Sequence, residues 1–245
     1  MGEKASWFSY WFDSEFYHIL YSDRNHEEAD LFVEKLINFL KISRDTSILD
    51  LGCGKGRHSF SLAQYSNNVM GVDLSSNSIQ YAQSQVKGQN PSFEIADMRH
   101  FKLSQTFDCI VNLFTSFGYF DTLSENEKVL SSIANHQQSQ GILLIDYLNS
   151  EKVRSQGASK TIKTMQGIDF HLDKYLTENH VFKKINFEYQ DEKYEFEERV
   201  QLFQKEELEA MIINAGYEIL QVYGNYIMET YHIASDRMII VSRKK

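Results

Sequence analysis

Residues 48–59, ILDLGCGKGRHS, decide how the rest of the chain is arranged. Ile48, Leu49 and Leu51 form a short apolar run, and glycines at 52, 54 and 56 follow where the chain must turn. This order predicts a buried strand, a glycine loop and the start of a helix. Such a loop lets backbone approach a ligand, and the first N–H groups of the helix favour negative charge. Arg57 stands where a dinucleotide fingerprint carries its third glycine, and the Gly-Lys-Ser/Thr of a P-loop does not follow.

Length and composition favour one main domain. The 245 residues are 42% apolar and contain a single proline, Pro91, so the chain can bury one sizeable core without a Pro-rich linker. Within a single domain of residues 1–245 we expect an N-terminal helical lid (1–41), a Rossmann-like core (42–150 and 202–245) and an inserted antiparallel sheet (151–201).

The charge and the cysteines narrow the class of protein. The formal charge of −9 argues against nucleic-acid binding, which needs Lys and Arg to neutralise phosphates. Glu3 and Lys4 open the chain and no uninterrupted apolar run follows, which predicts neither a signal peptide nor a membrane span. The two cysteines, Cys53 and Cys109, suit a reducing compartment, so we expect a cytoplasmic protein. They lack a Cys/His cluster at metal-ligand spacing, so no metal site is expected.

An acid at the end of the first strand, Asp50, followed by Gly-x-Gly-x-Gly, resembles the first motif of class I S-adenosylmethionine-dependent methyltransferases. The resemblance implies S-adenosylmethionine as cofactor and S-adenosylhomocysteine as product. It also implies cofactor contacts for the residues of the motif, which are Asp50, Gly52, Cys53, Gly54 and Gly56.

Residues 69–74, VMGVDL, predict the second strand, with Asp73 at its C-terminal end. An acid about twenty residues after a glycine loop, at the tip of the next parallel strand, can accept hydrogen bonds from both ribose hydroxyls. An acid after a strand is also a common helix N-cap, a role for which Ser75, Ser76 and Asn77 compete. The run DLSSNSIQYAQ resembles the family's second motif, which implies cofactor contacts for Asp73 and Leu74.

Phe93 to Ile95 predict a short third strand, followed by Asp97 and Met98. In the family an acid at this place binds the adenine amino group, and the next residue offers its backbone N–H and an apolar side chain to the ring. The resemblance implies these roles for Asp97 and Met98, and a thioether against a flat ring is chemically sensible. The alternative is that Asp97 is a solvated turn residue.

Residues 107–120, FDCIVNLFTSFGYF, predict the central fourth strand and the loop beyond its carboxyl end. In a doubly wound sheet, ligands bind outside these strand ends, near the switch in strand order. We expect backbone carbonyls of Asn112 and Leu113 to face the cofactor and an aromatic wall, including Phe114 and Tyr119, to stand beside the methyl donor. For any single aromatic, ordinary core packing is the alternative.

Residues 7–21, WFSYWFDSEFYHILY, hold eight aromatics and predict an amphipathic helix. The helix either packs on the core or forms a lid over a ligand. Tyr17 and Tyr21 lie four apart and share a helix face, and in similar methyltransferases a Tyr here reaches the cofactor. A second helix over 25–40 is expected to bury Leu31, Leu36, Phe39 and Leu40.

The remaining pattern completes an α/β class fold. It predicts a helix over 123–138, a strand over 141–148, four alternating strands between Lys160 and Leu202, a helix over 204–216, and strands near 217–224 and 236–244. The closing pattern resembles that of small class I methyltransferases, with an antiparallel hairpin at the edge. The expected architecture is a doubly wound, mostly parallel seven-stranded sheet with an inserted small antiparallel β-sheet.

The predicted function is methyl transfer from S-adenosylmethionine to an N or O atom of a small-molecule metabolite by in-line displacement. Two other classes stay open: an NAD(P)-dependent oxidoreductase on a related fold, and a non-catalytic cofactor-binding protein. Candidates for proton transfer are Tyr17, Tyr21, Tyr119 and His232, with His18 beside them, and the catalytic group itself is unknown. We expect a small-molecule methyl acceptor, no nucleic acid and no membrane, and either a monomer or a homodimer paired through the inserted sheet.

Overall fold

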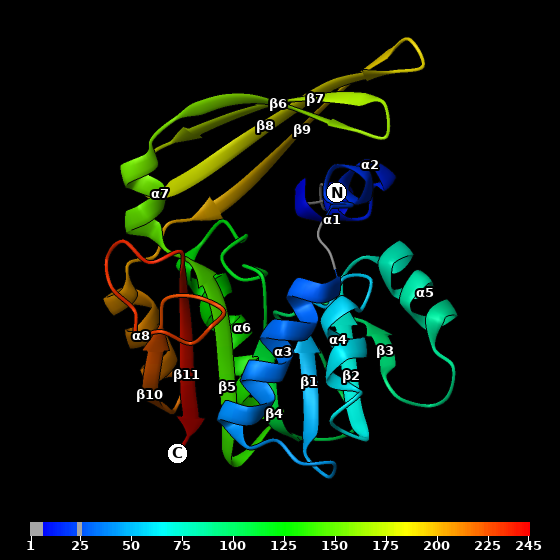
Figure 1. Cartoon of the computed structure of the whole chain (residues 1–245). Coiled ribbons are helices and arrows are strands. Elements are labelled where there is room, and N and C mark those ends of the chain that lie inside the picture. The colour runs from blue at the N-terminus through cyan, green and yellow to red at the C-terminus, as the bar shows by residue number, and fades with distance from the viewer. Residues whose placement is uncertain (1–6, 24–25) are drawn as a thin grey trace, which may run out of the picture.

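The computed structural model of the chain describes residues 7–23 and 26–245. Its larger sheet contains seven strands, which are β1 (Ser47–Leu51), β2 (Asn68–Asp73), β3 (Ser92–Ile95), β4 (Phe107–Asn112), β5 (Gln137–Leu148), β10 (Tyr217–Tyr223) and β11 (Arg237–Lys244). Their order is β10-β11-β5-β4-β1-β2-β3 (Figure 1). The strands from β3 to β5 are paired in parallel, whereas β11 runs antiparallel to β5 and β10. The strand order switches between β1 and β4, which is where such sheets bind ligands.

Helices cover both faces of this sheet. On one face, α3 (His26–Leu40) and α4 (Arg57–Leu62) pack on a cluster that includes Ile48, while α6 (Leu123–Asn135) and α8 (Lys205–Asn214) pack on the other face with Leu49. α5 (Ser76–Gln85) lies against β3 through Ile79 and Phe93. Neighbouring residues of β1 therefore belong to two cores, as expected for a strand buried on both faces. The predicted doubly wound fold is confirmed.

The helix α3 buries a different face from the one predicted. Leu31 and Phe39 are exposed, with 62% and 43% of their surface accessible, and only partial burial is found at Leu40. The buried stripe consists of Ala29, Phe32, Val33, Leu36 and Ile37. These positions are spaced by three and four residues, which is the repeat of a helix face. Leu36 is buried as predicted, whereas Leu31, five residues before Leu36, falls outside that repeat. Phe39 fits the spacing but lies at the edge of the stripe, where its ring packs on Tyr223.

A second sheet of four antiparallel strands follows β5. α7 (Ser150–Gln156), a helix that the sequence pattern did not predict, leads into β6 (Ser159–Met165), β7 (Ile168–Leu176), β8 (His180–Tyr189) and β9 (Glu192–Gln201). Figure 1 shows this sheet extending over the carboxyl ends of the parallel strands. The predicted inserted sheet is confirmed, and it bounds one side of the space above the switch point.

The N-terminal aromatic segment forms two short helices rather than one. α1 (Trp7–Phe12) ends before Ser14, whose hydroxyl accepts a hydrogen bond from the Phe16 N–H and so caps α2 (Glu15–Leu20). Trp11, Phe16 and Leu20 are buried in a cluster with the second sheet. Both helices lie between the two sheets in Figure 1. Together, α1, α2 and β6–β9 are called the cover region below.

In the part of the chain that the structure describes, no helix is both long enough and apolar enough to cross a membrane.

Candidate active site

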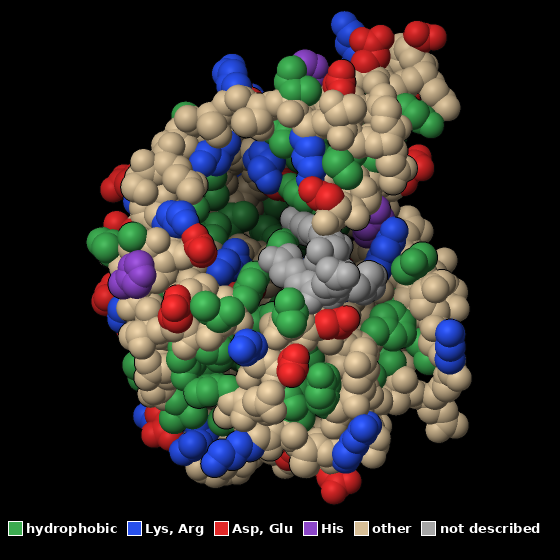
Figure 2. Space-filling view, viewed as in Figure 1, with side chains coloured by type: hydrophobic (Ala, Val, Ile, Leu, Met, Phe, Trp, Pro, Cys, Tyr) green, Lys and Arg blue, Asp and Glu red, His purple; other side chains and the backbone are tan. Residues whose placement is uncertain are grey.

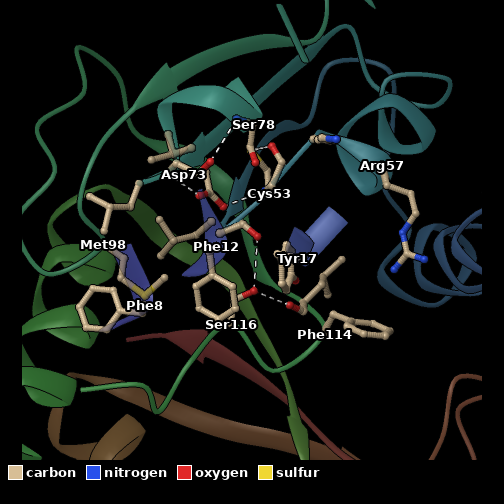
Figure 3. A pocket seen from close by; sticks show the side chains of 18 of the residues that line it. Phe8, Phe12, Tyr17, Cys53, Arg57, Asp73, Ser78, Met98, Phe114 and Ser116 are labelled. Atoms are coloured by element: carbon tan, nitrogen blue, oxygen red, sulfur yellow. Dashed lines mark hydrogen bonds between the residues drawn. The ribbon is translucent and has the colours of Figure 1, made fainter. Parts of the chain in front are cut away.

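A cavity of about 720 Å³ lies where the carboxyl ends of the parallel strands meet the cover region. In Figure 2 the molecule is hollowed between the second sheet and the core, with Lys and Arg side chains around the opening. Figure 3 shows Met98 and Phe8 at one end of the cavity, Arg57 and Phe114 at the other, and Asp73 between them. The cavity is thus bounded by the motifs that the sequence singled out and by aromatics of α1.

Most of the predicted cofactor residues come together in its wall. The cavity is lined by Tyr17, Tyr21, Gly52, Cys53, Gly54, Asp73, Leu74, Asp97, Met98, Leu113 and Phe114. Tyr119 and His18, two of the candidates for proton transfer, line it as well. Asp50, Gly56, Asn112 and His232 are not among the lining residues.

The glycine loop needs its glycines for two different reasons. Gly52, with φ +78°, is crowded, because a Cβ there would lie 2.7 Å from the Cβ of Ser116. Gly54, with φ +54°, has no atom within 4 Å of an added Cβ, so the added carbon would project into open space. Positive φ values are costly for other residues in both places. Gly52 therefore allows close packing, and Gly54 keeps the floor of the cavity open.

Asp73 is held by the backbone around it. Its Oδ2 accepts the Gly54 N–H at 2.8 Å and its Oδ1 accepts the Ser75 N–H at 2.8 Å. Burial raises the pKa of Asp73, while these backbone hydrogen bonds oppose the shift. Each carboxylate oxygen has a second lone pair, so the group can still accept two hydroxyl donors. The N-cap of α5 is Ser75 rather than Asp73, which removes the alternative that Asp73 serves as that cap.

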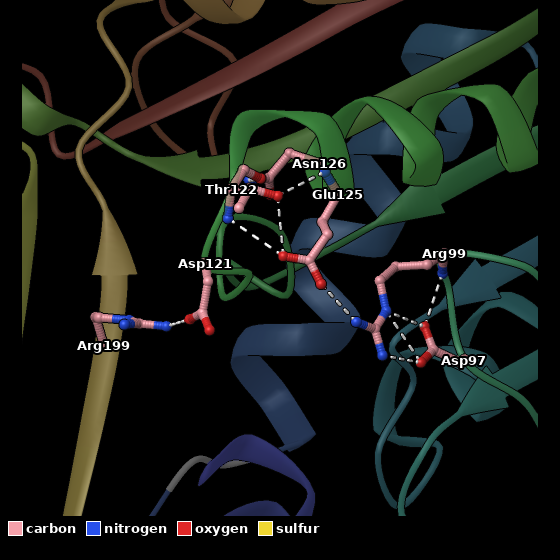
Figure 4. A network of polar contacts seen from close by, with 7 residues as sticks. All are labelled: Asp97, Arg99, Asp121, Thr122, Glu125, Asn126 and Arg199. Atoms are coloured by element: carbon pink, nitrogen blue, oxygen red, sulfur yellow. Dashed lines mark hydrogen bonds and ion pairs between the residues drawn. The ribbon is translucent and has the colours of Figure 1, made fainter. Parts of the chain in front are cut away.

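Asp97 is part of a network that joins the cavity to α6 (Figure 4). Arg99 binds Asp97 through Nη2 at 2.6 Å and reaches Glu125 through Nη1 at 2.7 Å. Burial alone would raise the pKa of Asp97, but the hydrogen bonds and charge of Arg99 lower it. Asp97 is therefore an ionised, fixed carboxylate rather than a solvated turn residue. Its contact with adenine stays a prediction.

Asn112 and Asp50 lie behind the cavity wall. Asn112 donates from Nδ2 to the Leu51 carbonyl at 2.8 Å, and its buried Oδ1 has no hydrogen-bond partner among the described residues. Asp50 accepts the Ser59 hydroxyl at 2.6 Å, and burial raises its pKa to about 6. Both residues support the backbone of the loop, and direct cofactor contact remains a prediction for each.

Gly56 allows the glycine loop to pack closely against Phe93 and does not face the cavity. It is the N-cap residue of α4, with φ +80°, and a Cβ there would lie 2.6 Å from the Phe93 ring. His232 belongs to the segment between β10 and β11, where Ser235 Oγ accepts its N–H. Neither Gly56 nor His232 lines the cavity. The cofactor contact of Gly56 and the proton transfer by His232 therefore remain predictions.

The N-terminal helices attach to the core and to the second sheet. Asp13 accepts hydrogen bonds from the Ser75 hydroxyl at 2.6 Å and from the Asn77 N–H at 3.0 Å. The ring of His18 lies 3.2 Å from the Ser78 hydroxyl, and burial together with Lys55 lowers the pKa of His18 to about 4. His18 is therefore neutral at pH 7, and the two helices are joined to the start of α5 beside the cavity.

The sequence reasoning missed Glu198, a carboxylate that β9 places in the cavity wall. Its Oε1 accepts the Tyr21 hydroxyl at 2.6 Å and the Trp11 indole N–H at 2.9 Å, and its Oε2 accepts the Lys183 ammonium at 2.9 Å. Burial alone would raise the pKa of Glu198, but Lys183 and the hydrogen bonds lower it. The signal was present, because Phe196, Glu198 and Val200 share one face of an alternating strand, so Glu198 interrupts an apolar face.

The residues that line the cavity fit a nucleoside. The fixed carboxylate of Asp73 suits ribose hydroxyls, Met98 offers a flat apolar contact, and the open position at Gly54 lets a ligand approach the backbone. Asp73 and Met98 line the same cavity, with Met98 toward the end where Phe8 lies (Figure 3).

A family described as "Methyltransferase domain" matches residues 42–216. This chain belongs to that family. The family uses S-adenosylmethionine, so the cofactor that the sequence implied is confirmed. Membership in this family also sets aside the NAD(P)-dependent oxidoreductase.

Individual relatives are distant. A putative methyltransferase of Geobacillus sp. strain WCH70 is 29% identical over 148 residues, which are 60% of this chain and 58% of the relative. The dTDP-3-amino-3,4,6-trideoxy-alpha-D-glucopyranose N,N-dimethyltransferase of Streptomyces venezuelae is 28% identical over 101 residues, 41% of this chain and 42% of the relative. The matches thus span about half the length of these relatives.

A solved structure covers almost the whole chain. The S-adenosylmethionine-dependent methyltransferase of Clostridium acetobutylicum ATCC 824 aligns with a TM-score of 0.80 and 17% identity, over 94% of this chain and 96% of that one. The fold of 94% of this chain is therefore shared with a methyltransferase.

Proposed function

We propose that the protein transfers the methyl group of S-adenosylmethionine to an amine nitrogen of a small polar molecule. The observation that carries this proposal is Glu198, a carboxylate kept ionised by Lys183 in a cavity wall that also contains the aromatic rings of Phe12, Tyr17 and Tyr119. Ammonium groups bind to aromatic faces and to carboxylates. An amine is therefore a better match to this wall than a neutral hydroxyl. A bound ammonium must release one proton to water before its nitrogen has the lone pair that methyl transfer requires.

The relatives support an amine on a sugar as the first class to test. One of them is named as an N,N-dimethyltransferase of a dTDP-linked amino sugar. The net charge of −9 does not favour a nucleic-acid substrate.

The chain's residues bind and align the reactants. S-adenosylmethionine supplies a methyl group bonded to a positively charged sulfur. Asp73 and the glycine loop hold the nucleoside, and Glu198 orients the amine. Alignment of two bound reactants can lower a barrier by roughly 7–11 kcal/mol. α1 and α2 exclude water by covering the cavity with aromatic rings, among them Phe8 and Phe12.

The test is a methylation assay on matched acceptors. Purified protein is incubated with S-adenosylmethionine and pairs of compounds that differ only in an amino or hydroxyl group, beginning with amino-sugar nucleotides and amino acids. A mass gain of one methyl on amines, with equal formation of S-adenosylhomocysteine, is expected. Methylation of the hydroxyl partner instead would overturn the assignment to nitrogen. Tight cofactor binding without turnover on any acceptor would favour the non-catalytic alternative.

A matched pair of variants tests the role of Glu198. Glu198→Gln removes the charge and is expected to raise the KM for the amine by about tenfold, which corresponds to about 1.4 kcal/mol. Glu195→Gln is the control, because Glu195 lies on the same strand with an exposed side chain. An equal KM in both variants would remove Glu198 from acceptor binding.

A further inference from the structure

The loop after β4 contains two consecutive residues in the left-handed region. Phe114 has φ +60° and Thr115 has φ +61°, and neither is a glycine. Such a conformation costs roughly 1–2 kcal/mol for each residue and is a clear outlier for a β-branched side chain such as Thr115. It persists only where the surroundings impose it. Because Phe114 lines the cavity, this conformation shapes the wall itself.

Asp146 holds the backbone of both residues. Its Oδ2 accepts the Phe114 N–H at 2.8 Å, and its main-chain carbonyl accepts the Thr115 N–H at 2.9 Å. Asp146 lies on β5 and is 1% exposed. Both N–H groups of the strained pair are therefore bound by a single buried residue.

Arg237, the first residue of β11, holds Asp146 and Thr115 together. Its Nε donates to Asp146 Oδ1 at 2.7 Å and its Nη2 donates to Thr115 Oγ1 at 2.7 Å. Tyr226 adds a hydrogen bond from its hydroxyl to Asp146 Oδ2 at 3.0 Å. Burial alone would lower the pKa of Arg237, but Asp146 raises it, so Arg237 stays charged. The Arg237 guanidinium also lies 5.8 Å from the centre of the Phe114 ring.

We propose that Asp146 and Arg237 are positioning residues for the cofactor site. They impose the left-handed conformation on Phe114 and Thr115, and so fix the Phe114 wall in the shape that receives S-adenosylmethionine. Neither of them lines the cavity, and they act through the backbone of the loop. The proposal concerns cofactor binding and does not depend on the identity of the methyl acceptor.

The test measures the affinity for S-adenosylhomocysteine by calorimetry. Arg237→Gln is expected to weaken binding by tenfold or more, because the loop relaxes. Arg243→Gln is the matched control, since Arg243 lies on the same strand and pairs with the exposed Glu218. It is expected to keep the wild-type affinity.

A suppressor separates positioning from general stability. Glycine adopts positive φ without strain, so adding Thr115→Gly to Arg237→Gln is expected to restore the affinity to within about threefold of the wild type. The midpoint of thermal unfolding without ligand is not expected to recover, because the ion pair with Asp146 stays absent. Wild-type affinity in Arg237→Gln, or no recovery in the double variant, would overturn the proposal.

If Arg237→Gln does not fold, Tyr226→Phe carries the same test. It removes one hydrogen bond to Asp146 and keeps the ring, with an expected two- to fivefold loss of affinity. Recovery on adding Thr115→Gly would support the proposal, and an unchanged affinity in Tyr226→Phe would overturn it.

Discussion

The core and the cover region build their parts of the cavity in different ways. In the core, the ligand-facing groups are set by backbone: the positive φ of Gly54, the end of β2 at Asp73, and the loop after β4. In the cover region, the wall depends on side chains that meet from distant segments, as Trp11 and Glu198 do across 187 positions. A site made from backbone tolerates little change, whereas one made from side chains can be altered residue by residue.

The largest expected effect concerns Asp73 in the core. Asp73→Ala removes two acceptors for hydroxyl groups and the anchor of the Gly54 N–H. Hydrogen bonds to a charged group contribute about 1.5–3 kcal/mol each, so the loss of two should weaken the binding of S-adenosylhomocysteine by about two to four orders of magnitude. Calorimetry measures this loss, with Asp45→Ala, at an exposed position, as the control. Equal affinities of the two variants would remove Asp73 from the site.

A pH effect of similar size is expected at Asp50. Its pKa is about 6, above the ordinary 3.8, because the side chain is buried. Because the folded protein binds the proton of Asp50 more tightly than the unfolded chain, protonated Asp50 stabilises the fold. This contribution to the free energy of unfolding is complete below about pH 4 and is lost as the pH rises through 6. The loss amounts to about 3 kcal/mol at most.

Asp50→Asn removes this titration, since an amide oxygen can still accept the Ser59 hydroxyl. Urea unfolding at pH 4 and pH 7 should therefore show the variant gaining stability relative to the wild type at the higher pH. A difference between the two proteins that does not change with pH would contradict the prediction.

The glycine loop offers a matched pair within the core. Gly52→Ala should destabilise the fold by about 2–3 kcal/mol, because the new Cβ meets Ser116 at a positive φ. Gly54→Ala should cost about 1 kcal/mol in stability yet weaken cofactor binding at least tenfold, since its Cβ enters the cavity. Denaturant unfolding and calorimetry measure the two quantities. If both variants lost stability and cofactor affinity in the same ratio, the assignment of Gly52 to packing and of Gly54 to the cavity floor would be wrong.

The smallest expected effect lies in the cover region. Tyr21→Phe removes the hydroxyl that donates to Glu198 and accepts from Lys183. The packing of the N-terminal helices on the second sheet should therefore lose about 1 kcal/mol of stability. Hydrogen exchange should become faster in residues 7–23 and stay unchanged in β1. Tyr10→Phe, at a 67% exposed ring, is the control. Faster exchange throughout the molecule would show that the cover region and the core do not differ in their local stability.

The sequence predicted the core because its signals are local. The run from Ile48 to Ser59 contains the strand, the turn and the helix start within twelve residues, and each follows from the residue types alone. The alternation between Lys160 and Leu202 likewise predicted all four strands of the second sheet. Periodicity is a property of neighbouring residues, so it can be recognised without knowledge of tertiary contacts.

The groups that were missed depend on contacts between distant segments. Arg237 gains its role from partners on other elements, so no spacing along the chain marks it. Glu198 interrupts the apolar face of β9, but its partners Tyr21 and Trp11 come from α2 and α1 and meet it only in the folded chain. The break between α1 and α2 depended on the Ser14 cap, which competes locally with the continuous helical pattern of the aromatics. The prediction of one helix over residues 7–21 followed the aromatic pattern and did not consider that Ser14 would cap a new helix.

The second sheet is joined to the core at one end. The chain enters it through α7 after β5 and returns beside the loop after β4, where Gln201 N–H donates to the Gly118 carbonyl at 2.9 Å. Because entry and exit lie near each other, the four strands form a module that could be exchanged between relatives as one graft. A chimera of this kind would take residue 198 from the donor of the graft and keep Phe12, Tyr17 and Tyr119 of the recipient, so only part of its acceptor preference would change, while its affinity for S-adenosylhomocysteine would follow the recipient.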